Sequence, residues 1–382
     1  MGKGGGRVHY LDNSATTPLC AEAKAALAQA ADAFGNPSSL HALGAAALAS
    51  LNEARATVAA AIGCAPREVI FTSGGSEANN TALFGAARAK ARQGRHIVAS
   101  AVEHPSVLNA LSALEKEGFT VTLVPPDGQG RIAPEAVIAA LRPDTVLVSL
   151  MAVNNETGAL FPTAAIKPAL KAVGSSALVH VDGVQAFGKI ALRPETVGAD
   201  LISVSGHKIH APKGVGALYL SKNARILPLI HGGGQEFGLR SGTESTLLIA
   251  AFAAAVKALP DRKAALDKVQ ALRDDAVRRL CALPGVVLNS PEDGLPYLFN
   301  FSVEGIRSET LLHFLESREI YVSSGSACAK GRASHVLTAQ GLPRDRIDSA
   351  LRVSFSRFST PADVDALVAA VAEGAATLKR KK

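Results

Sequence analysis

Between residues 69 and 220, short β-branched and apolar runs alternate with longer alanine-rich stretches of helical character. This alternation is typical of βαβ units, in which consecutive strands lie parallel in one sheet and helices cover its faces. The sequence therefore predicts an α/β fold with a mostly parallel sheet. The expected strands are Val69–Thr72, His96–Ser100, Thr120–Val124, Val146–Met151, Leu178–Asp182, Leu201–Val204 and Val215–Leu220. The expected helices among them are Glu77–Gln93, Pro105–Glu117, Pro134–Leu141 and Ala165–Val173.

The pattern changes near residues 250–260, where a long helical region, Thr246–Leu283, is interrupted by Pro260. Because proline lacks a backbone donor and ends or kinks a helix, two helices are expected there. Shorter strands and helices follow, and they predict a smaller α+β unit. Its expected strands are Val286–Leu288, Tyr297–Val303, Ile320–Val322 and Ala350–Ser354, and its expected helices are Ser308–Ser317 and Pro361–Leu378.

Composition excludes several classes of protein. Of the 382 residues, 48% are hydrophobic and 19% are charged, which permits a large core and excludes a disordered tail or a collagen-like fibre. The longest apolar run, Leu247 to Val256, is about half of the ~20 residues that a membrane span needs. Residues 1–7 contain no apolar segment typical of a secretory signal. Four cysteines without paired spacing do not form a disulfide framework, so a reducing, cytoplasmic location is expected.

The formal net charge is +7, from 40 Lys and Arg against 33 Asp and Glu. An excess of this size suits either a nucleic-acid partner or an anionic small ligand. However, the two signs are interspersed, the one basic run is residues 379–382, and only 4% of residues are aromatic and able to stack on bases. We therefore expect no direct nucleic-acid partner and no membrane partner.

Polar and small residues directly follow several predicted strands. Ligands of open parallel sheets bind at the carboxyl ends of the strands, so these residues would meet at one edge. Gly75 and Ser76 follow the first strand and open a helix, whose free backbone N–H groups can bind a phosphate. Each of these strand-end segments, taken alone, is also compatible with an ordinary turn. The segments are residues 72–77, 103–105, 153–158, 182–185 and 203–208.

A phosphate cradle, a carboxylate and a lysine together match the needs of pyridoxal phosphate. Its aldehyde condenses with a lysine amine, and an aspartate keeps its ring nitrogen protonated. Asp182 ends a buried strand, where a carboxylate requires a cationic partner. Lys208 is the expected attachment point, with Ser205 and His207 near the phosphate. Lys213 is the competitor, but it lies in a Pro-Lys-Gly turn and is expected to face solvent.

Several motifs occur in order along the chain: residues 10–18, 35–39, 103–104, 153–156, 240–243 and 323–328. The segment 200–208, which ends in Ser-Gly-His207-Lys208, is similar to the lysine signature of the class V aminotransferases. The whole set resembles the cysteine desulfurases of the iron–sulfur-cluster and nitrogen-fixation type. This resemblance runs from about residue 8 to about residue 375.

The resemblance implies a fold-type I pyridoxal-phosphate transferase, with a large domain around a mostly parallel seven-stranded sheet and a smaller α+β C-terminal domain. It implies an N-terminal segment, 1–15, that packs with the small domain, a large cofactor-binding domain, 16–255, and a small domain, 256–382, that carries the Cys328 loop. It also implies a homodimer, because Thr243 of the neighbouring subunit would complete each phosphate site.

The resemblance further implies a role for each matching residue. Lys208 would carry the cofactor and move protons at the substrate carbon, His104 would stack on the cofactor ring, and Asp182 would pair with the ring nitrogen. The residues expected at the phosphate are Gly75, Ser76, Ser205, His207 and Thr243, and those expected at the ring substituent are Asn155 and Gln185. The residues expected to bind the substrate are Asn36, Asn155 and Arg352.

By the same resemblance, Cys328 would be the catalytic nucleophile. It would take the sulfur of L-cysteine as a persulfide, leave L-alanine, and pass the sulfur to an acceptor protein of iron–sulfur-cluster or tRNA-thiolation pathways. This chemistry requires an exposed, ionisable thiol, and small neighbours followed by Lys330 and Arg332 suit it. The other cysteines, Cys20, Cys64 and Cys281, are expected to be buried small hydrophobes.

Other functions stay open on the residues alone. A selenocysteine lyase or another class V β-lyase would use the same cofactor and need not use Cys328. A catalytically silent scaffold could retain the fold. A nucleotide site is disfavoured because residues 214–219 lack the third glycine of a dinucleotide fingerprint. No metal is expected, since His207, His210 and His231 have no ligand-spacing signature.

Overall fold

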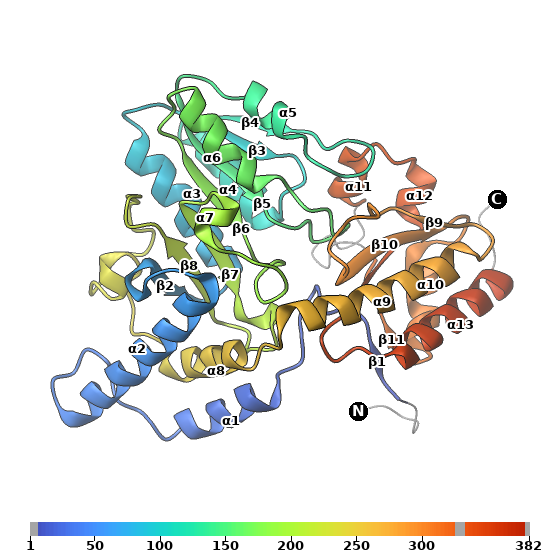
Figure 1. The fold of residues 1–382 in the computed structure, drawn as a ribbon, viewed down its shortest axis with the longest axis horizontal. Coiled ribbons are helices and arrows are strands. Elements are labelled where there is room, and N and C mark those ends of the chain that lie inside the picture. The colour runs from blue at the N-terminus through green and yellow to red at the C-terminus, as the bar shows by residue number, and fades with distance from the viewer. Residues whose placement is uncertain (1–6, 325–332, 379–382) are drawn as a thin grey trace.

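The computed structural model describes residues 7–324 and 333–378, and its larger part is a seven-stranded sheet flanked by helices (Figure 1). The strand order is β2-β8-β7-β6-β5-β3-β4. Neighbours pair in parallel except at β8, which is antiparallel to both β2 and β7, so the predicted mostly parallel sheet is confirmed. The strands are β2 (Val69–Thr72), β3 (His96–Ser100), β4 (Thr120–Val124), β5 (Thr145–Met151), β6 (Leu178–Asp182), β7 (Leu201–Ser205) and β8 (Gly216–Leu220).

Helices cover both faces of this sheet because its inner strands are apolar on both sides. In β3, Ile97 and Ala99 join one hydrophobic cluster while Val98, between them, joins the other. On the Ile97 side lie α3 (Gly75–Lys90) and α4 (Pro105–Lys116), and on the Val98 side lie α5 (Pro134–Ala139), α6 (Thr163–Ala172) and α7 (Pro194–Val197).

Three helices pack together beside the sheet, at the lower left of Figure 1. They are α1 (Ala21–Ala30), α2 (Ala42–Ile62) and α8 (Thr246–Lys257). Helices α1 and α2 are not among the elements that the sequence predicts, because alanine occupies both their buried and their exposed positions and weakens the contrast between the two faces.

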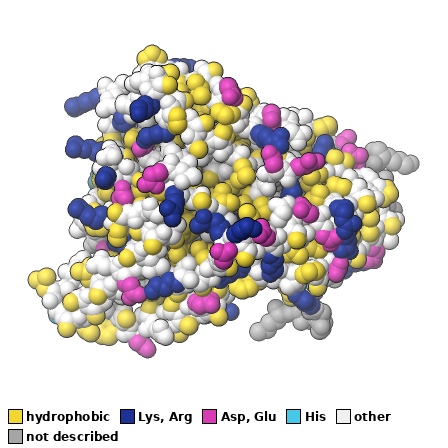
Figure 2. Space-filling view, viewed as in Figure 1, with side chains coloured by type: hydrophobic (Ala, Val, Ile, Leu, Met, Phe, Trp, Pro, Cys, Tyr) yellow, Lys and Arg dark blue, Asp and Glu magenta, His cyan; other side chains and the backbone are white. Residues whose placement is uncertain are grey.

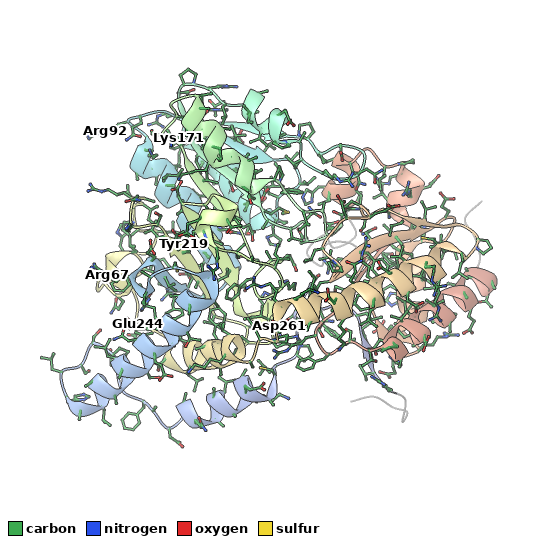
Figure 3. All side chains as sticks on the ribbon, in the orientation of Figure 1. Arg67, Arg92, Lys171, Tyr219, Glu244 and Asp261 are labelled. Atoms are coloured by element: carbon green, nitrogen blue, oxygen red, sulfur yellow. The ribbon has the colours of Figure 1, made fainter. Side chains whose placement is uncertain are left out.

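A second, antiparallel sheet of order β12-β10-β9 forms the smaller part of the molecule. Helix α9 (Arg262–Cys281) leads to it and begins after Asp261, whose carboxylate accepts a hydrogen bond from the amide of Ala264 (Figure 3). The predicted break between two helices at Pro260 is confirmed. The other elements are β9 (Val286–Leu288), β10 (Leu298–Val303), β12 (Ala350–Ser354), α10 (Ser308–Glu316), α11 (His335–Ala339), α12 (Arg344–Asp348) and α13 (Pro361–Thr377).

The N-terminal segment runs along this second part of the molecule. Strand β1 (His9–Tyr10) pairs in parallel with β11 (Ile320–Tyr321), and Asp12 forms a β-bridge with Ser354. The segment then turns toward the large sheet, where the hydroxyl of Thr17 donates to the carbonyl of His207. Residues 12–16 therefore lie between the two sheets.

Within residues 7–324 and 333–378, no helix is long and apolar enough to cross a membrane. Of the cysteines outside the Cys328 segment, Cys20 is buried and Cys64 is partly buried. Cys281 is exposed, so the expectation of a buried side chain is wrong there. The preceding residue, Leu280, faces the core, and one step along a helix turns the next side chain by about 100°, toward solvent.

Candidate active site

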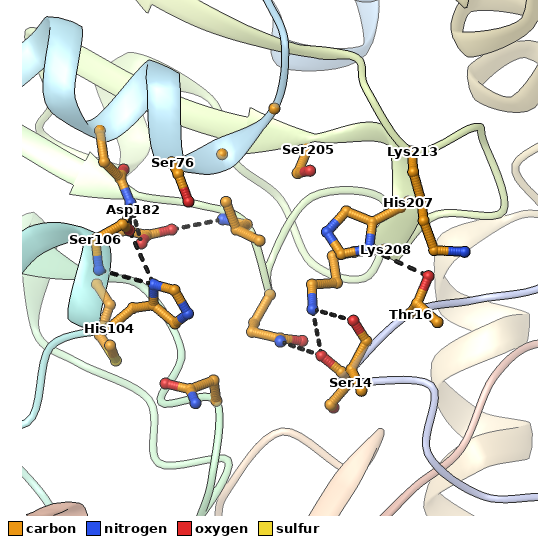
Figure 4. A pocket seen from close by; sticks show the side chains of 18 of the residues that line it. Ser14, Thr16, Ser76, His104, Ser106, Asp182, Ser205, His207, Lys208 and Lys213 are labelled. Carbon is orange, nitrogen blue, oxygen red and sulfur yellow. Dashed lines mark hydrogen bonds between the residues drawn. The ribbon is translucent and has the colours of Figure 1, made fainter. Parts of the chain in front are cut away.

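A cavity of about 560 Å³ lies at the edge of the large sheet where β2, β6 and β7 end (Figure 4). Its lining comes from the N-terminal segment, the start of α3, the turn before α4, the ends of the strands and one residue of the small sheet. This is the edge at which the sequence predicts a ligand. The predicted site residues that line the cavity are Gly75, Ser76, His104, Asn155, Asp182, Gln185, Ser205, His207, Lys208 and Arg352.

One end of the cavity is suited to an anion. Helix α3 starts at Gly75 directly after β2, and its N-cap, Gly74, provides no side-chain cap, so the first-turn N–H groups point to the cavity without intrahelical partners. A Cβ at Gly75 would lie 2.7 Å from a methyl carbon of Val184, so glycine is required there. The buried hydroxyl of Ser205 faces the same place and has no hydrogen-bond partner among the described residues.

The opposite end holds a carboxylate. Asp182 ends β6, and its two oxygens accept hydrogen bonds from the amide group of Asn79 (2.8 Å) and the backbone N–H of Val184 (3.0 Å). The imidazole of His104, at the N-cap of α4, lies nearby, and its Nδ1 accepts from the backbone N–H of Ser106 (3.1 Å). Burial lowers the pKa of His104, with Asp182 opposing that effect. Burial thus favours the neutral form of the ring that faces the cavity.

Lys208 enters the cavity between these two ends (Figure 4). It closes a short 3₁₀ turn, η2 (Gly206–Lys208), that follows β7, and its Nζ donates to the backbone carbonyls of Ser14 and Ala15. Burial, together with the charges of Lys208 and Lys213, lowers the pKa of His207 to about 4. The competing lysine, Lys213, is exposed as predicted, although it also lines the cavity.

The small sheet contributes one guanidinium. Arg352, in the middle of β12, is 2% exposed and donates to Asp12 Oδ1 (2.9 Å) and to the backbone carbonyl of Asn155 (2.9 Å). The side-chain oxygen of Asn155 is buried without a hydrogen-bond partner among the described residues. The amide nitrogen of Gln185 donates to the carbonyl of Ser14 (3.1 Å). A fixed cation and two amides thus border the space in front of Lys208.

Two of the predicted site residues do not line this cavity. Asn36 is exposed in the loop between α1 and α2, and its side-chain oxygen accepts from the backbone N–H of Ser38 (2.9 Å). Thr243 is exposed and does not line the cavity of its own chain. Cys328 lies outside the described residues. A single chain therefore brings together the residues of the sheet edge but not Asn36 and Thr243.

Sequence reasoning missed the residues that support the predicted ones. Asn79 holds Asp182, and it could have been found because it lies four residues, about one helical turn, after Gly75. Asp12 and Ser14 carry no such signal, because their roles depend on contacts with residues more than 190 positions away. Within the described part of the chain, no group of three His, Cys, Asp or Glu side chains could hold a metal ion.

Comparison with known proteins defines the class. The family model for aminotransferase class V matches residues 9–367, and the chain belongs to this family. It is 44% identical over 371 residues to a NifS/IcsS protein homolog of Lactobacillus delbrueckii subsp. bulgaricus, covering 95% of this chain and 96% of the relative. It is 39% identical to the cysteine desulfurase IscS of Methanosarcina thermophila, covering 95% and 91%.

Solved structures are similar to this chain over most of its length. A NifS-like protein superimposes with a TM-score of 0.92 at 36% identity, covering 97% of this chain and all of the other. A structure described as SspA in complex with cysteine has a TM-score of 0.82 at 33% identity, covering 92% of this chain and all of the other. The predicted resemblance and fold class are therefore confirmed.

Proposed function

We propose that this protein is a pyridoxal-phosphate-dependent cysteine desulfurase, which converts L-cysteine to L-alanine and transfers the sulfur to Cys328. The observation that carries the proposal is the convergence of Lys208, Asp182 and an uncapped helix N-terminus at Gly75 in one cavity. The names of the relatives support the choice of reaction and substrate. A reducing, cytoplasmic setting suits a thiol and its persulfide.

The residues present fit the cofactor. The first-turn N–H groups of Gly75 and Ser76 and the unpartnered hydroxyl of Ser205 offer donors to a phosphate. Asp182 would hold the proton on the ring nitrogen, and His104 would cover the ring. When bound, pyridoxal phosphate supplies an electron sink for the carbanion formed at the substrate Cα.

The amine of Lys208 would anchor the cofactor and afterwards move protons at the substrate carbon. Its hydrogen bonds to the carbonyls of Ser14 and Ala15 support this role, because they hold Nζ between the two ends of the cavity. Gln185 and Asn155 would orient the cofactor and substrate by hydrogen bonds.

Arg352 would bind the substrate carboxylate with its planar fork of donors. Its bond to Asp12 supports this role, because the carboxylate holds the nearly inaccessible guanidinium in place. Asn36 is proposed to assist in binding the substrate carboxylate. Because it is exposed in the loop between α1 and α2, it must act in another subunit or after a rearrangement.

The sulfur transfer falls to Cys328. Its thiolate would attack the sulfur of the substrate, so that a sulfur–sulfur bond forms as the carbon–sulfur bond breaks. The electron pair of the broken bond stays with the substrate carbon, which takes up protons and leaves as alanine. The persulfide on Cys328 then passes its outer sulfur to an acceptor protein of iron–sulfur-cluster or tRNA-thiolation pathways.

A homodimer with shared sites is part of the proposal. Thr243 is exposed and outside its own cavity, as a residue that reaches a neighbouring phosphate site would be. Large hydrophobic side chains are also exposed around the α1–α2 loop, where Phe34 is 83% and Leu43 is 53% exposed, and yellow side chains gather at the lower left of Figure 2. Exposed patches of this kind mark interaction surfaces.

The division of the chain is proposed as residues 1–15, 16–255 and 256–382. The strands of the large sheet, Val69 to Leu220, and those of the small sheet, Val286 to Ser354, fall on the two sides of the last boundary. The pairing of β1 with β11 supports the assignment of the N-terminal segment to the small domain.

The test is to load the protein with pyridoxal phosphate, add L-cysteine and a reductant, and quantify alanine and sulfide together. We expect equal amounts of the two, and loss of both in Cys328→Ala. Pyruvate with ammonia would instead indicate β-elimination, and activity on selenocysteine that survives Cys328→Ala would indicate a selenocysteine lyase. A protein that binds no cofactor would be a silent scaffold.

A further inference from the structure

A second lysine, Lys189, is buried directly behind the candidate active site. Its side chain is only 8% exposed, and it forms no ion pair with a carboxylate of the described residues. Its Nζ donates to the side-chain oxygen of Gln185 (3.2 Å) and lies 5.7 Å from the centroid of the Tyr297 ring. An ammonium has three donors, and burying it with so few acceptors is costly.

The position of Lys189 follows from the turn that succeeds β6. Backbone hydrogen bonds to the carbonyls of Gly183 and Ala186 turn the chain after β6, and this turn brings the amine of Lys189 to the side chain of Gln185. The other end of the Gln185 amide donates to the carbonyl of Ser14, which also accepts from Lys208. A small cavity of about 30 Å³ is lined by both lysines. One continuous polar chain therefore joins Lys189 to Lys208.

We propose that Lys189 is a positioning residue of the cofactor site. Its amine fixes the amide of Gln185 so that the oxygen points away from the cavity and the nitrogen points toward it as a donor. It also places a second positive charge beside the amine of Lys208. This inference rests on the proposed function, because it assigns the donor of Gln185 and the added charge to a bound anionic cofactor.

The electrostatic surroundings of Lys189 agree with this role. Burial, together with the charges of Lys208 and Arg352, lowers its pKa to about 7. An anionic cofactor bound next to Gln185 would favour the charged form of Lys189, and in return the charged amine would stabilise that cofactor. The groups that act on Lys189 or feel its charge are Lys208, Arg352, His207 and His210, with the ring of Tyr297 as the aromatic neighbour.

If Lys189 had a purely structural role, Lys189→Met would lower the melting temperature of the apoprotein. A role toward the cofactor predicts no such decrease. A buried amine with one acceptor among the described residues destabilises the cofactor-free fold relative to an apolar side chain of similar length, so Lys189→Met should leave the melting temperature of the apoprotein unchanged or raise it. If Lys189 serves the cofactor, the same variant should bind pyridoxal phosphate more weakly. Stability and cofactor affinity would then change in opposite directions.

The experiment compares Lys189→Met with the wild type and with Lys171→Met, which removes the same charge at an exposed position of α6 (Figure 3). Three quantities are measured for each: the melting temperature of the apoprotein, the dissociation constant for pyridoxal phosphate, and the pH midpoint of the visible absorption of the bound cofactor. For Lys189→Met we expect about tenfold weaker binding. We also expect a midpoint about one pH unit higher, because removing a neighbouring cation favours the protonated form.

A double-mutant cycle with Gln185→Leu tests whether Lys189 acts through that amide. We expect the two substitutions together to weaken cofactor binding clearly less than the sum of their separate effects. The inference is overturned if Lys189→Met keeps the midpoint of the wild type, whatever its affinity, or if the two effects add. A wild-type protein that develops no visible absorption with pyridoxal phosphate would instead refute the proposed function, which separates the two failures.

Discussion

The two sides of the cavity are built in different ways. On the side of the large sheet, Asp182 stands where β6 ends and is held by Asn79 and Val184, which both belong to the large-sheet part of the molecule. On the side of the small sheet, Arg352 lies in the middle of β12 and is held by Asp12, 340 positions away. The first group is fixed by the end of a strand, whereas the second depends on the assembly of distant segments. Substitutions on the two sides should therefore impair the protein in different ways.

The largest effect is expected on the side of the large sheet, from Lys208→Ala. Because this amine would both anchor the cofactor and move protons, alanine formation should fall by about 10²–10⁴-fold or more. Lys213→Ala, which removes an exposed lysine from the rim of the same cavity, is the control and should retain most of the activity. Equal losses in the two variants would contradict the assignment of Lys208.

The second-largest effect is expected from a substitution on the side of the small sheet. Arg352→Met removes the proposed partner of the substrate carboxylate and leaves Asp12 unpaired, so KM for L-cysteine should rise by about 30-fold or more. Cofactor affinity should change much less, because Arg352 belongs to the small sheet, whereas Gly75, Ser76 and Ser205 of the phosphate cradle belong to the large-sheet part. Kinetics over a range of L-cysteine concentrations would check this. A variant that lost the cofactor but kept its KM would show that the two sides are not distinct.

The same contrast explains what could be predicted from the sequence. Strand periodicity and the rule that ligands bind at strand ends predicted the sheet and placed Asp182, Ser205 and Lys208 at one edge, because each side chain is positioned by its own element. The contact between Asp12 and Arg352 could not be predicted, since it depends on how the N-terminal segment crosses to the small sheet. The resemblance supplied Arg352 as a substrate residue but not its partner.

The positions of Asn36 and Thr243 mark a different limit. Both were predicted from motifs, and both lie on the exposed surface, away from the cavity of their own chain. The resemblance assigns Thr243 to the neighbouring subunit, whereas no motif states which copy of the chain supplies Asn36. The supporting residue Asn79 was within reach of sequence reasoning, because helical spacing aligns it with the start of α3.

A third, smaller effect tests how firmly the large sheet fixes its carboxylate. Asn79→Ala removes a hydrogen bond of 2.8 Å to Asp182, and we expect pyridoxal phosphate to bind about tenfold more weakly. Asn80→Ala is the matched control, because among the described residues the Asn80 amide donates to the backbone carbonyls of Ser76 and Ser106 and not to Asp182. Titration of each apoprotein with the cofactor measures the difference. Indistinguishable affinities for the two variants would mean that Val184 alone holds Asp182.

The last and smallest effect is on the pH dependence of stability, and it comes from Glu103, a residue at the contact between the two regions. Glu103 is fully buried beside the cavity, and its backbone carbonyl lies 3.0 Å from Nε2 of His335, the first residue of α11. Burial raises the pKa of the Glu103 carboxyl to about 8, with a further contribution from Asp182. Its Oε1 accepts from the hydroxyl of Ser100 and from the backbone N–H of Met151 (2.9 Å).

A carboxyl with a raised pKa in the fold stays protonated there while the unfolded chain ionises, so the unfolded chain binds fewer protons. The free energy of unfolding should therefore fall as the pH rises from about 4.5 to about 8, by no more than about 5 kcal/mol from this group. Glu103→Gln keeps the accepting oxygen and cannot ionise, so its stability relative to the wild type should increase across this range. Denaturant unfolding at several pH values, with the exposed Glu309→Gln as the control, measures the difference. Parallel pH profiles for wild type and Glu103→Gln would mean that Glu103 is ionised in the fold, and that this side of the cavity carries two adjacent negative charges rather than one.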